Sequence, residues 1–141
     1  MTWKKYPASL DHYESMRADL DDAAAELSEH LKMKLELGFE EAVVNVIDYA
    51  YDIEGSIWIK THRDEEFFNI EIIDLGRPFN PIEYNDARAE DHSPIEEREL
   101  GGFGIFLIKK TFERLKYSRE KFNGTSANHL SLSLRIDNDE G

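Results

Sequence analysis

The sequence predicts an α+β fold, a two-layer sandwich in which three helices cover one face of a mixed, mostly antiparallel sheet. Apolar residues recur at helical spacing in three segments, and they alternate with polar residues in four others. The alternating segments come in pairs, which indicates hairpins rather than strand–helix–strand crossovers. Because 141 residues are typical of one domain with a sufficient core, we expect a single domain over residues 1–141.

Composition narrows the classes of function. The chain has 17 basic and 30 acidic residues, and its net charge of −13 argues against nonspecific binding to nucleic acid or to an anionic membrane. A nucleotide ligand is not excluded, because backbone amides alone can make a local pocket positive. The lack of cysteine excludes a disulfide framework and a thiolate metal site. No apolar run resembles a signal peptide or reaches the length of a membrane span, so a soluble cytoplasmic protein is expected.

The N-terminal part of the chain is predicted to hold a short edge strand and two helices. The aromatic residues 3–6 can form the strand. Ser9 can cap a helix over residues 10–29, whose apolar side chains share one stripe. A second helix is expected over residues 33–52, and Gly55 ends it.

The rest of the chain is predicted to hold four strands, a third helix and a long loop. The loop, residues 76–100, lacks periodicity and holds three of the four prolines. A loop of this length in a small domain is usually functional or disordered. Residues 103–115 return to helical spacing, and Asn123-Gly124 predicts a tight hairpin turn. The strands are expected at residues 57–62, 67–74, 116–122 and 129–136.

Four polar side chains recur at i, i+4, i+7 and i+11 in the second predicted helix. Glu41, Asn45, Asp48 and Asp52 would share a stripe nearly opposite the apolar face. An acid one turn before a carboxamide can place a proton acceptor beside a ligand for a divalent cation. A solvated helix face explains the same pattern, and this stretch alone favours that interpretation.

Two glycine-bearing stretches change the balance towards a binding site. In Asp74-Leu75-Gly76, the acid can accept a hydrogen bond from an exocyclic amine such as that of adenine, and the glycine lets a flat ring approach. Gly101-Gly102-Phe103-Gly104 leads into a predicted helix, so its free backbone N–H groups can hold phosphate. Its spacing is neither the Walker nor the Rossmann pattern. Taken singly, the first stretch also fits an ordinary turn and the second a flexible hinge.

Together the stretches resemble the GHKL ATP-binding family, whose Bergerat fold is shared by gyrase and histidine kinases. The resemblance is closest to the small anti-sigma-factor serine/threonine kinases of bacteria, and it covers nearly the whole chain. Residues 78–81, Pro-Phe-Asn-Pro, are similar to the PFDP sequence that follows Asp-x-Gly in those kinases. The matching motifs, in chain order, are Glu41-Ala-Val-Val-Asn45, Asp74-x-Gly76-x-Pro-Phe79 and Gly101-Gly102-x-Gly104.

The resemblance implies roles for four residues around a bound ATP. Asn45 matches the asparagine that coordinates the Mg²⁺ bridging the ATP phosphates. Glu41 matches the acid taken as the general base towards the acceptor serine hydroxyl. Asp74 matches the aspartate that binds the adenine amine, and Gly76 would lie beneath the adenine ring.

The resemblance also assigns the phosphate side of the site. Gly102 and Gly104 match the phosphate-side glycines, and residues 77–100 match the ATP lid. The family's last ATP-site motif has two candidates in this chain, Gly124-Thr125 and Asn128-His129-Leu130, and the sequence does not choose between them.

Two positions depart from the family pattern. Many of these kinases carry a basic residue shortly after the asparagine, where this chain has Asp48 and Tyr49. Some carry an arginine directly before the glycine pair, where this chain has Leu100 and has Arg98 two positions earlier. The departures bear on catalytic rate more than on nucleotide binding.

The resemblance implies an ATP- and Mg²⁺-dependent serine/threonine protein kinase that acts as an anti-sigma factor. Its partners would be a sigma factor and a STAS-domain anti-sigma antagonist, which it would phosphorylate; nucleic acid and membrane are not expected as direct partners, and a homodimer is one option. The alternative is a non-catalytic regulator of the same fold, in which nucleotide only sets the binding state. A detached histidine-kinase ATPase domain is less favoured, because His12 lies on no dimerisation helix of the kind that carries a phosphoacceptor.

Overall fold

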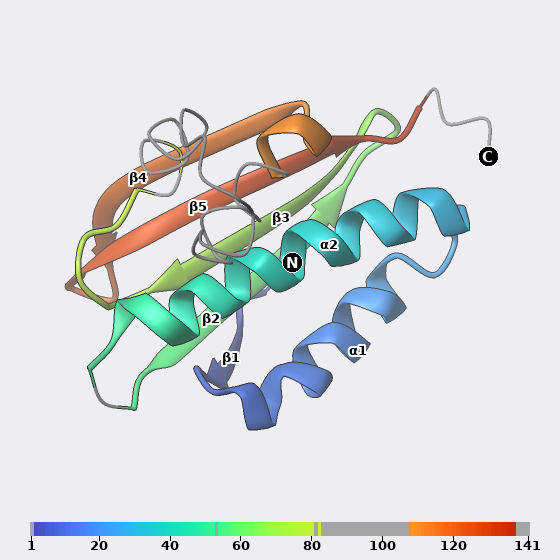
Figure 1. The fold of residues 1–141 in the computed structure, drawn as a ribbon. Coiled ribbons are helices and arrows are strands. Elements are labelled where there is room, and N and C mark those ends of the chain that lie inside the picture. Colours follow the sequence, from blue (N-terminus) through green and yellow to red (C-terminus); the bar gives the residue numbers. More distant parts are fainter. Residues whose placement is uncertain (1, 53, 81, 83–107, 138–141) are drawn as a thin grey trace, which may run out of the picture.

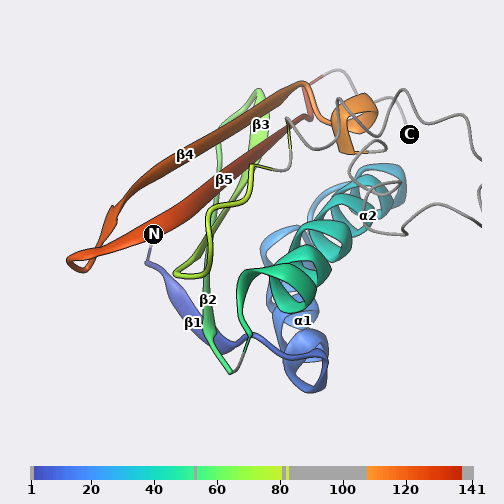
Figure 2. The same ribbon diagram turned by 60° about the vertical axis from the view of Figure 1, so that its left-hand side comes forward.

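The computed structural model describes residues 2–52, 54–80, 82 and 108–137. Its five-stranded sheet has the order β1-β2-β3-β5-β4, and every ladder between these strands is antiparallel. The helices lie on one face of the sheet (Figure 1, Figure 2), so the predicted α+β sandwich is confirmed. Residues 108–111 are helical, and the other elements are β1 Lys4–Pro7, η1 Leu10–His12, α1 Tyr13–Ala23, α2 Glu29–Asn45, η2 Val46–Ala50, β2 Ser56–Arg63, β3 Phe67–Asp74, β4 Arg114–Phe122 and β5 Thr125–Arg135.

The first two helices divide the N-terminal region differently from the prediction. α1 ends at Ala23, so the helix predicted over residues 10–29 was wrong at its C-terminal end. After a turn, Ser28 begins α2 by accepting a hydrogen bond from the Leu31 N–H at 3.2 Å. Ala24 is buried in that turn and prolongs the apolar spacing beyond the end of α1, which is why spacing alone placed the boundary too late.

The core lies between α1, α2 and the covered face of the sheet. α2 contributes Leu35 and Phe39, and the strands contribute Ile57, Ile70 and Leu132, all of them fully buried. Each such side chain stabilises the fold by about 1.5–3 kcal/mol through burial of apolar surface. Within the described ranges, no helix has the length and apolarity needed to cross a membrane.

Gly38 lies in the interior of α2, where glycine costs about 1 kcal/mol relative to alanine. It is buried, and a Cβ at this position would lie 2.1 Å from Phe112 Cε2. Phe112 directly follows the helical residues 108–111 and is only 4% exposed. Gly38 therefore allows this segment to pack closely against α2.

The structure around the end of α2 contradicts the prediction that four polar side chains share one stripe. Asn45 follows Ala42 by three residues, so it lies about 60° from the apolar face rather than opposite it, and it is 5% exposed. The chain then forms the π-helical turn η2, which changes the rotation per residue. Asp48 is exposed on this turn, and Asp52 lies beyond it. The four side chains therefore do not form one stripe.

Two hairpins make up most of the sheet. β2 and β3 pair as predicted. β4 begins at Arg114, earlier than predicted, and pairs with β5 from that residue on. The helix predicted over residues 103–115 therefore ends earlier than expected. β5 begins at Thr125, also earlier than expected, because Asn123 and Gly124 adopt φ angles of 51° and 82° and close the hairpin tightly.

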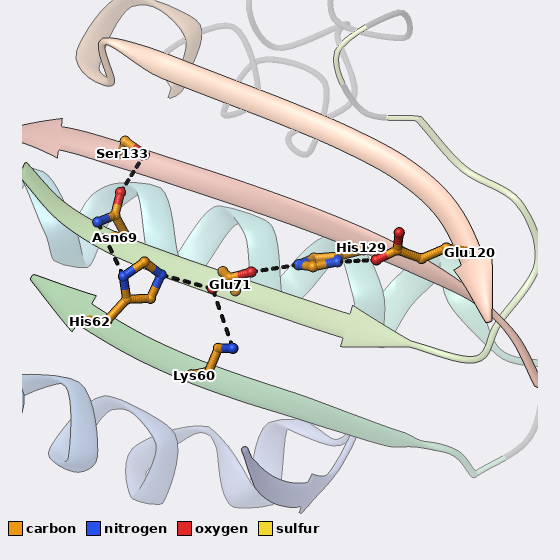
Figure 3. A network of polar contacts seen from close by, with 7 residues as sticks. All are labelled: Lys60, His62, Asn69, Glu71, Glu120, His129 and Ser133. Atoms are coloured by element: carbon orange, nitrogen blue, oxygen red, sulfur yellow. Dashed lines mark hydrogen bonds and ion pairs between the residues drawn. The ribbon is translucent and has the colours of Figure 1, made fainter. Parts of the chain in front are cut away.

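A chain of polar contacts crosses the sheet face opposite the helices (Figure 3). At its centre, the carboxylate of Glu71 on β3 lies 2.8 Å from His62 Nε2 and 2.8 Å from His129 Nε2. Lys60 Nζ lies 3.7 Å from the same carboxylate, and Glu120 Oε1 lies 2.6 Å from His129 Nδ1. Both ring nitrogens of His129 thus face carboxylates, an arrangement that a protonated ring satisfies. The contacts join β2, β3, β5 and β4.

The charge state of Glu71 makes this network sensitive to acid. Burial opposes ionisation, but the hydrogen bonds from His129 and His62 outweigh it and hold the pKa of Glu71 below its ordinary value. A lowered folded-state pKa means that the carboxylate stabilises the fold above the unfolded-state pKa of about 4.3, and that this stabilisation is lost as pH falls through the folded-state pKa.

We expect Glu71→Gln to lower the free energy of unfolding by about 1–3 kcal/mol near pH 7, because it removes hydrogen bonds to a charged group. The difference from wild type should begin to shrink at acidic pH below the unfolded-state pKa of about 4.3, and should disappear as pH falls through the lowered folded-state pKa of Glu71. Denaturant unfolding at both pH values measures it. Glu65→Gln, in the exposed β2–β3 turn, is the control and should stay within about 0.5 kcal/mol of wild type. A Glu71→Gln difference that is constant with pH would contradict the account.

We also expect Gly38→Ala to destabilise the protein, although alanine is the better helix former by about 1 kcal/mol. The added Cβ meets the Phe112 ring, and overpacking typically costs about 1–3 kcal/mol. In a Phe112→Ala background the same substitution should become neutral or stabilising, and a double-mutant cycle of unfolding free energies measures this coupling. Equal effects of Gly38→Ala in both backgrounds would exclude the contact as the reason for the glycine.

Candidate functional site

A pocket of about 490 Å³, including its open mouth, lies between the end of α2, the η2 turn and strands β3, β5 and β4. Most of its wall is apolar. The polar groups that reach it come from Asn45, Asp74, Asn128 and Tyr117, the first three of them 5% exposed. A largely apolar pocket with a few buried polar groups suits a flat ligand that makes a small number of directional hydrogen bonds.

Asp74 ends β3 with its carboxylate in this pocket. Its Oδ1 accepts hydrogen bonds from the Gly76 N–H and from Asn128 Nδ2, both at 2.9 Å. Burial raises the pKa of Asp74, and these two hydrogen bonds oppose that rise. Oδ2 receives no hydrogen bond from the part of the chain that the structure describes, so it remains for a donor on a ligand.

Gly76 is required where the chain leaves β3. A Cβ at this position would lie 2.1 Å from the carbonyl oxygen of Ala50, which belongs to the η2 turn. The same oxygen accepts a hydrogen bond from the Arg77 N–H at 2.9 Å. The Tyr51 hydroxyl adds a second tie, because it accepts from the Leu75 N–H at 2.8 Å. These contacts hold the predicted Asp-x-Gly motif against the η2 turn, which follows α2.

Asn45 lines the pocket and contacts Glu41, as their spacing of one helical turn predicts. Asn45 Nδ2 donates a long hydrogen bond of 3.4 Å to Glu41 Oε1. Asn45 Oδ1 is buried and has no hydrogen-bond partner within the described ranges. Buried polar atoms are seldom left unpaired, so this oxygen is available to a ligand, and an amide oxygen is a typical ligand for a hard divalent cation.

Glu41 is half-buried and has unusual acid–base properties. Burial raises its pKa to about 7, the charges of Glu40 and Asp48 act in the same direction, and the hydrogen bond from Asn45 opposes them. A carboxyl group that titrates near neutral pH can exchange a proton with a bound hydroxyl group efficiently. The pair thus places a proton acceptor beside a free oxygen ligand.

The strand register places the two candidates for the last motif at different points of the structure. Asn128 pairs with Asp74 across the β3–β5 ladder and lies in the pocket, whereas Gly124-Thr125 forms the tip of the β4–β5 hairpin. Leu130 also lines the pocket, and His129 points to the opposite face, where it contacts Glu71. The local sequence offers Asn128 as a candidate but does not favour it over Gly124-Thr125, because the place of Asn128 depends on which residue of β3 it faces.

Several predicted site residues lie outside the described residues. These are Gly102 and Gly104, the two positions Leu100 and Arg98, and most of the predicted lid. The beginning of the lid is described: Arg77 forms an ion pair with Asp52, and the Phe79 ring lies 6.0 Å from the Tyr49 ring. Asn45 and Asp74 therefore line one pocket, with Glu41 and Gly76 in contact with them, and the placement of the phosphate-side glycines stays a prediction.

Sequence comparison finds relatives among kinases. The serine-protein kinase RsbW of Halalkalibacterium halodurans is 26% identical over 88 residues, which cover 61% of this chain and 54% of that protein. The serine-protein kinase RsbW of Oceanobacillus iheyensis is 29% identical over 90 residues, which cover 61% of this chain and 57% of that protein. The chain thus spans about half the length of the curated relatives it matches.

Fold and family comparisons agree with the described architecture. The blue-light activated histidine kinase of Erythrobacter litoralis EL346 matches with a TM-score of 0.57 at 16% identity, over 82% of this chain and 33% of that one, and this likeness shows the fold. A family model described as the histidine kinase-like ATPase domain matches residues 6–133. The predicted GHKL resemblance is confirmed, and the chain belongs to the family of histidine kinase-like ATPase domains.

Proposed function

We propose that this chain is an ATP-dependent serine/threonine protein kinase that acts as an anti-sigma factor, binding a sigma factor and phosphorylating a serine of a STAS-domain antagonist. The observation that carries the proposal is the pairing of Glu41, with its pKa near 7, and Asn45, with its unpaired buried oxygen. The names of the two RsbW relatives, both serine-protein kinases, support the reaction class.

The nucleotide base would bind in the pocket. Asp74 Oδ2 would accept a hydrogen bond from the exocyclic amine of adenine, while Oδ1 is already held by Asn128 and Gly76. The apolar wall would pack against the ring faces. Gly102 and Gly104 would donate backbone N–H groups to the phosphates, with the residues between 77 and 100 as the lid.

A magnesium ion fits beside the base site. Asn45 Oδ1 would be its protein ligand, because it is a buried amide oxygen with no other partner within the described chain. When bound, the ion would neutralise part of the phosphate charge that grows during transfer.

Glu41 would take the proton of the acceptor serine. As the serine Oγ forms a bond to the γ-phosphorus, the bond from that phosphorus to the β–γ bridging oxygen breaks, and the hydroxyl proton passes to the Glu41 carboxylate. A pKa of about 7 leaves a useful fraction of the carboxylate ionised at neutral pH and makes it a stronger base than an exposed glutamate.

We expect ATP to stabilise the protein in the presence of Mg²⁺, by about 1.4 kcal/mol when its concentration is about tenfold above Kd. Thermal unfolding with ATP or ADP, with Mg²⁺ or with a chelator, measures this. Asn45→Ala should lose the Mg²⁺-dependent part of the shift, because it removes the free oxygen. Asp48→Ala, which truncates an exposed side chain on the next turn, should keep it. The absence of any nucleotide shift in wild type would refute the proposed function.

Glu41→Gln should separate binding from transfer. ATP affinity should stay within a few-fold of wild type, while phosphate transfer to a STAS-domain protein should fall by about 10²–10⁴-fold, the usual effect of removing a positioned general base. In wild type, the transfer rate should rise with pH through about 7, as the raised pKa of Glu41 requires, and then level off.

Glu40→Gln is the matched control for the Glu41 substitution. Glu40 is exposed, and its charge helps to raise the pKa of Glu41, so its removal should keep transfer and move the pH midpoint downwards. A Glu41→Gln protein that still transfers phosphate at the wild-type rate would overturn the proposed role of Glu41 as the base. Wild type that binds nucleotide but transfers no phosphate would instead favour the alternative assignment, a non-catalytic regulator whose binding to partners is set by nucleotide.

A further inference from the structure

The side chain of Asn128 forms hydrogen bonds at both ends of its amide group. Its Nδ2 donates to Asp74 Oδ1 at 2.9 Å and to the carbonyl oxygen of Arg77 at 2.8 Å. Its Oδ1 accepts from the Tyr117 hydroxyl and from the Phe79 N–H at 3.3 Å. Both amide hydrogens are therefore used, and the carbonyl oxygen has two donors.

A fifth contact fixes the orientation of this amide. Arg119 Nη1 donates to Asn128 Oδ1 at 3.1 Å and to the Gly76 carbonyl oxygen at 2.9 Å. Three donors thus converge on the oxygen end of Asn128, and two acceptors lie at its nitrogen end. If the amide were flipped, its NH₂ group would face the three donors and its oxygen would face the two acceptors. The side chain therefore has one stable orientation.

We propose that Asn128 is a positioning residue that couples recognition of the base to the placement of the chain after Gly76. This inference rests on the proposed nucleotide site. Through Nδ2 it holds Oδ1 of Asp74, which leaves Oδ2 directed to the ligand. Through both ends of the amide it binds the backbone on either side of Pro78, so residues 77–79 are fixed relative to the base-binding carboxylate.

The chemistry requires a carboxamide for both tasks together. An aspartate at position 128 would place a second carboxylate 2.9 Å from Asp74 Oδ1 and would offer no donor to Arg77. A threonine can donate its single hydroxyl hydrogen to Asp74, but it cannot also donate to the Arg77 carbonyl. Asn128→Thr therefore keeps a donor to Asp74 and removes the hydrogen bond to the Arg77 carbonyl, which weakens the hold on residues 77–79.

The experiment compares wild type, Asn128→Ala and Asn128→Thr. Calorimetry with Mg²⁺ measures the ratio of ATP to GTP affinity, and amide exchange without nucleotide measures protection of the Phe79 N–H. We expect Asn128→Ala to reduce the affinity ratio by about tenfold or more, because Asp74 loses its anchor, and to speed exchange at Phe79. Asn128→Thr should keep the ratio within a few-fold of wild type and still speed exchange at Phe79.

Two further variants separate positioning from general destabilisation. Asn69→Thr removes a β-sheet asparagine on the opposite face, where it contacts His62 and Ser133, and should change neither readout. Tyr117→Phe removes only one donor to Asn128 and tests the inference if Asn128→Ala does not fold; it should lower the affinity ratio by a smaller factor.

The outcomes distinguish the inference from the function on which it rests. Wild type that binds neither ATP nor GTP would overturn the proposed function together with the base-recognition half of the inference, while Phe79 exchange would still test the other half. Wild type that prefers ATP, with Asn128→Ala and Tyr117→Phe retaining the same ratio and the same exchange at Phe79, would overturn the inference alone.

Discussion

One close backbone contact, between Gly76 and the carbonyl of Ala50, determines the geometry of the site. No side chain larger than hydrogen fits there, and the same carbonyl accepts the N–H of Arg77. The contact places the end of β3 directly against the π-helical turn η2, which follows α2. Because α2 carries Asn45 and β3 carries Asp74, it sets the separation between the proposed metal side and base side without any direct bond between those two side chains.

Charge poses the main difficulty for the proposed ligand. The protein has a net charge of −13, and two acids, Glu41 and Asp74, belong to the described site, whereas a nucleotide triphosphate is strongly anionic. Burial raises the pKa of both acids, and it raises that of Glu41 to about 7, so Glu41 carries only part of a negative charge near neutral pH. The unpaired oxygen of Asn45 then offers a place for a compensating cation without adding a further negative charge.

The layers and the hairpins could be predicted, and the candidate site residues of α2 and β3 could be proposed, because their signals are local. Alternation marks β2 and β3, Asn123-Gly124 marks a turn, and the motifs around Asn45 and Asp74 have characteristic spacing. The π-helical turn was missed because apolar spacing assumes a constant rotation per residue. Asn128 could not be chosen from sequence, because its role follows from its register opposite Asp74, 54 positions earlier in the chain.

The β4–β5 hairpin carries different tasks on its two faces. Asn128 and Arg119 contact each other on the pocket side. Their neighbours His129 and Glu120 contact each other on the opposite face, in the chain of polar contacts centred on Glu71. Because side chains of a strand alternate with a period of two, one inserted or deleted residue in either arm would exchange these tasks. If both faces keep their tasks during divergence, the arms of this hairpin can change length only in even steps. Parity of length, rather than residue identity, is therefore the constraint by which related hairpins should be aligned.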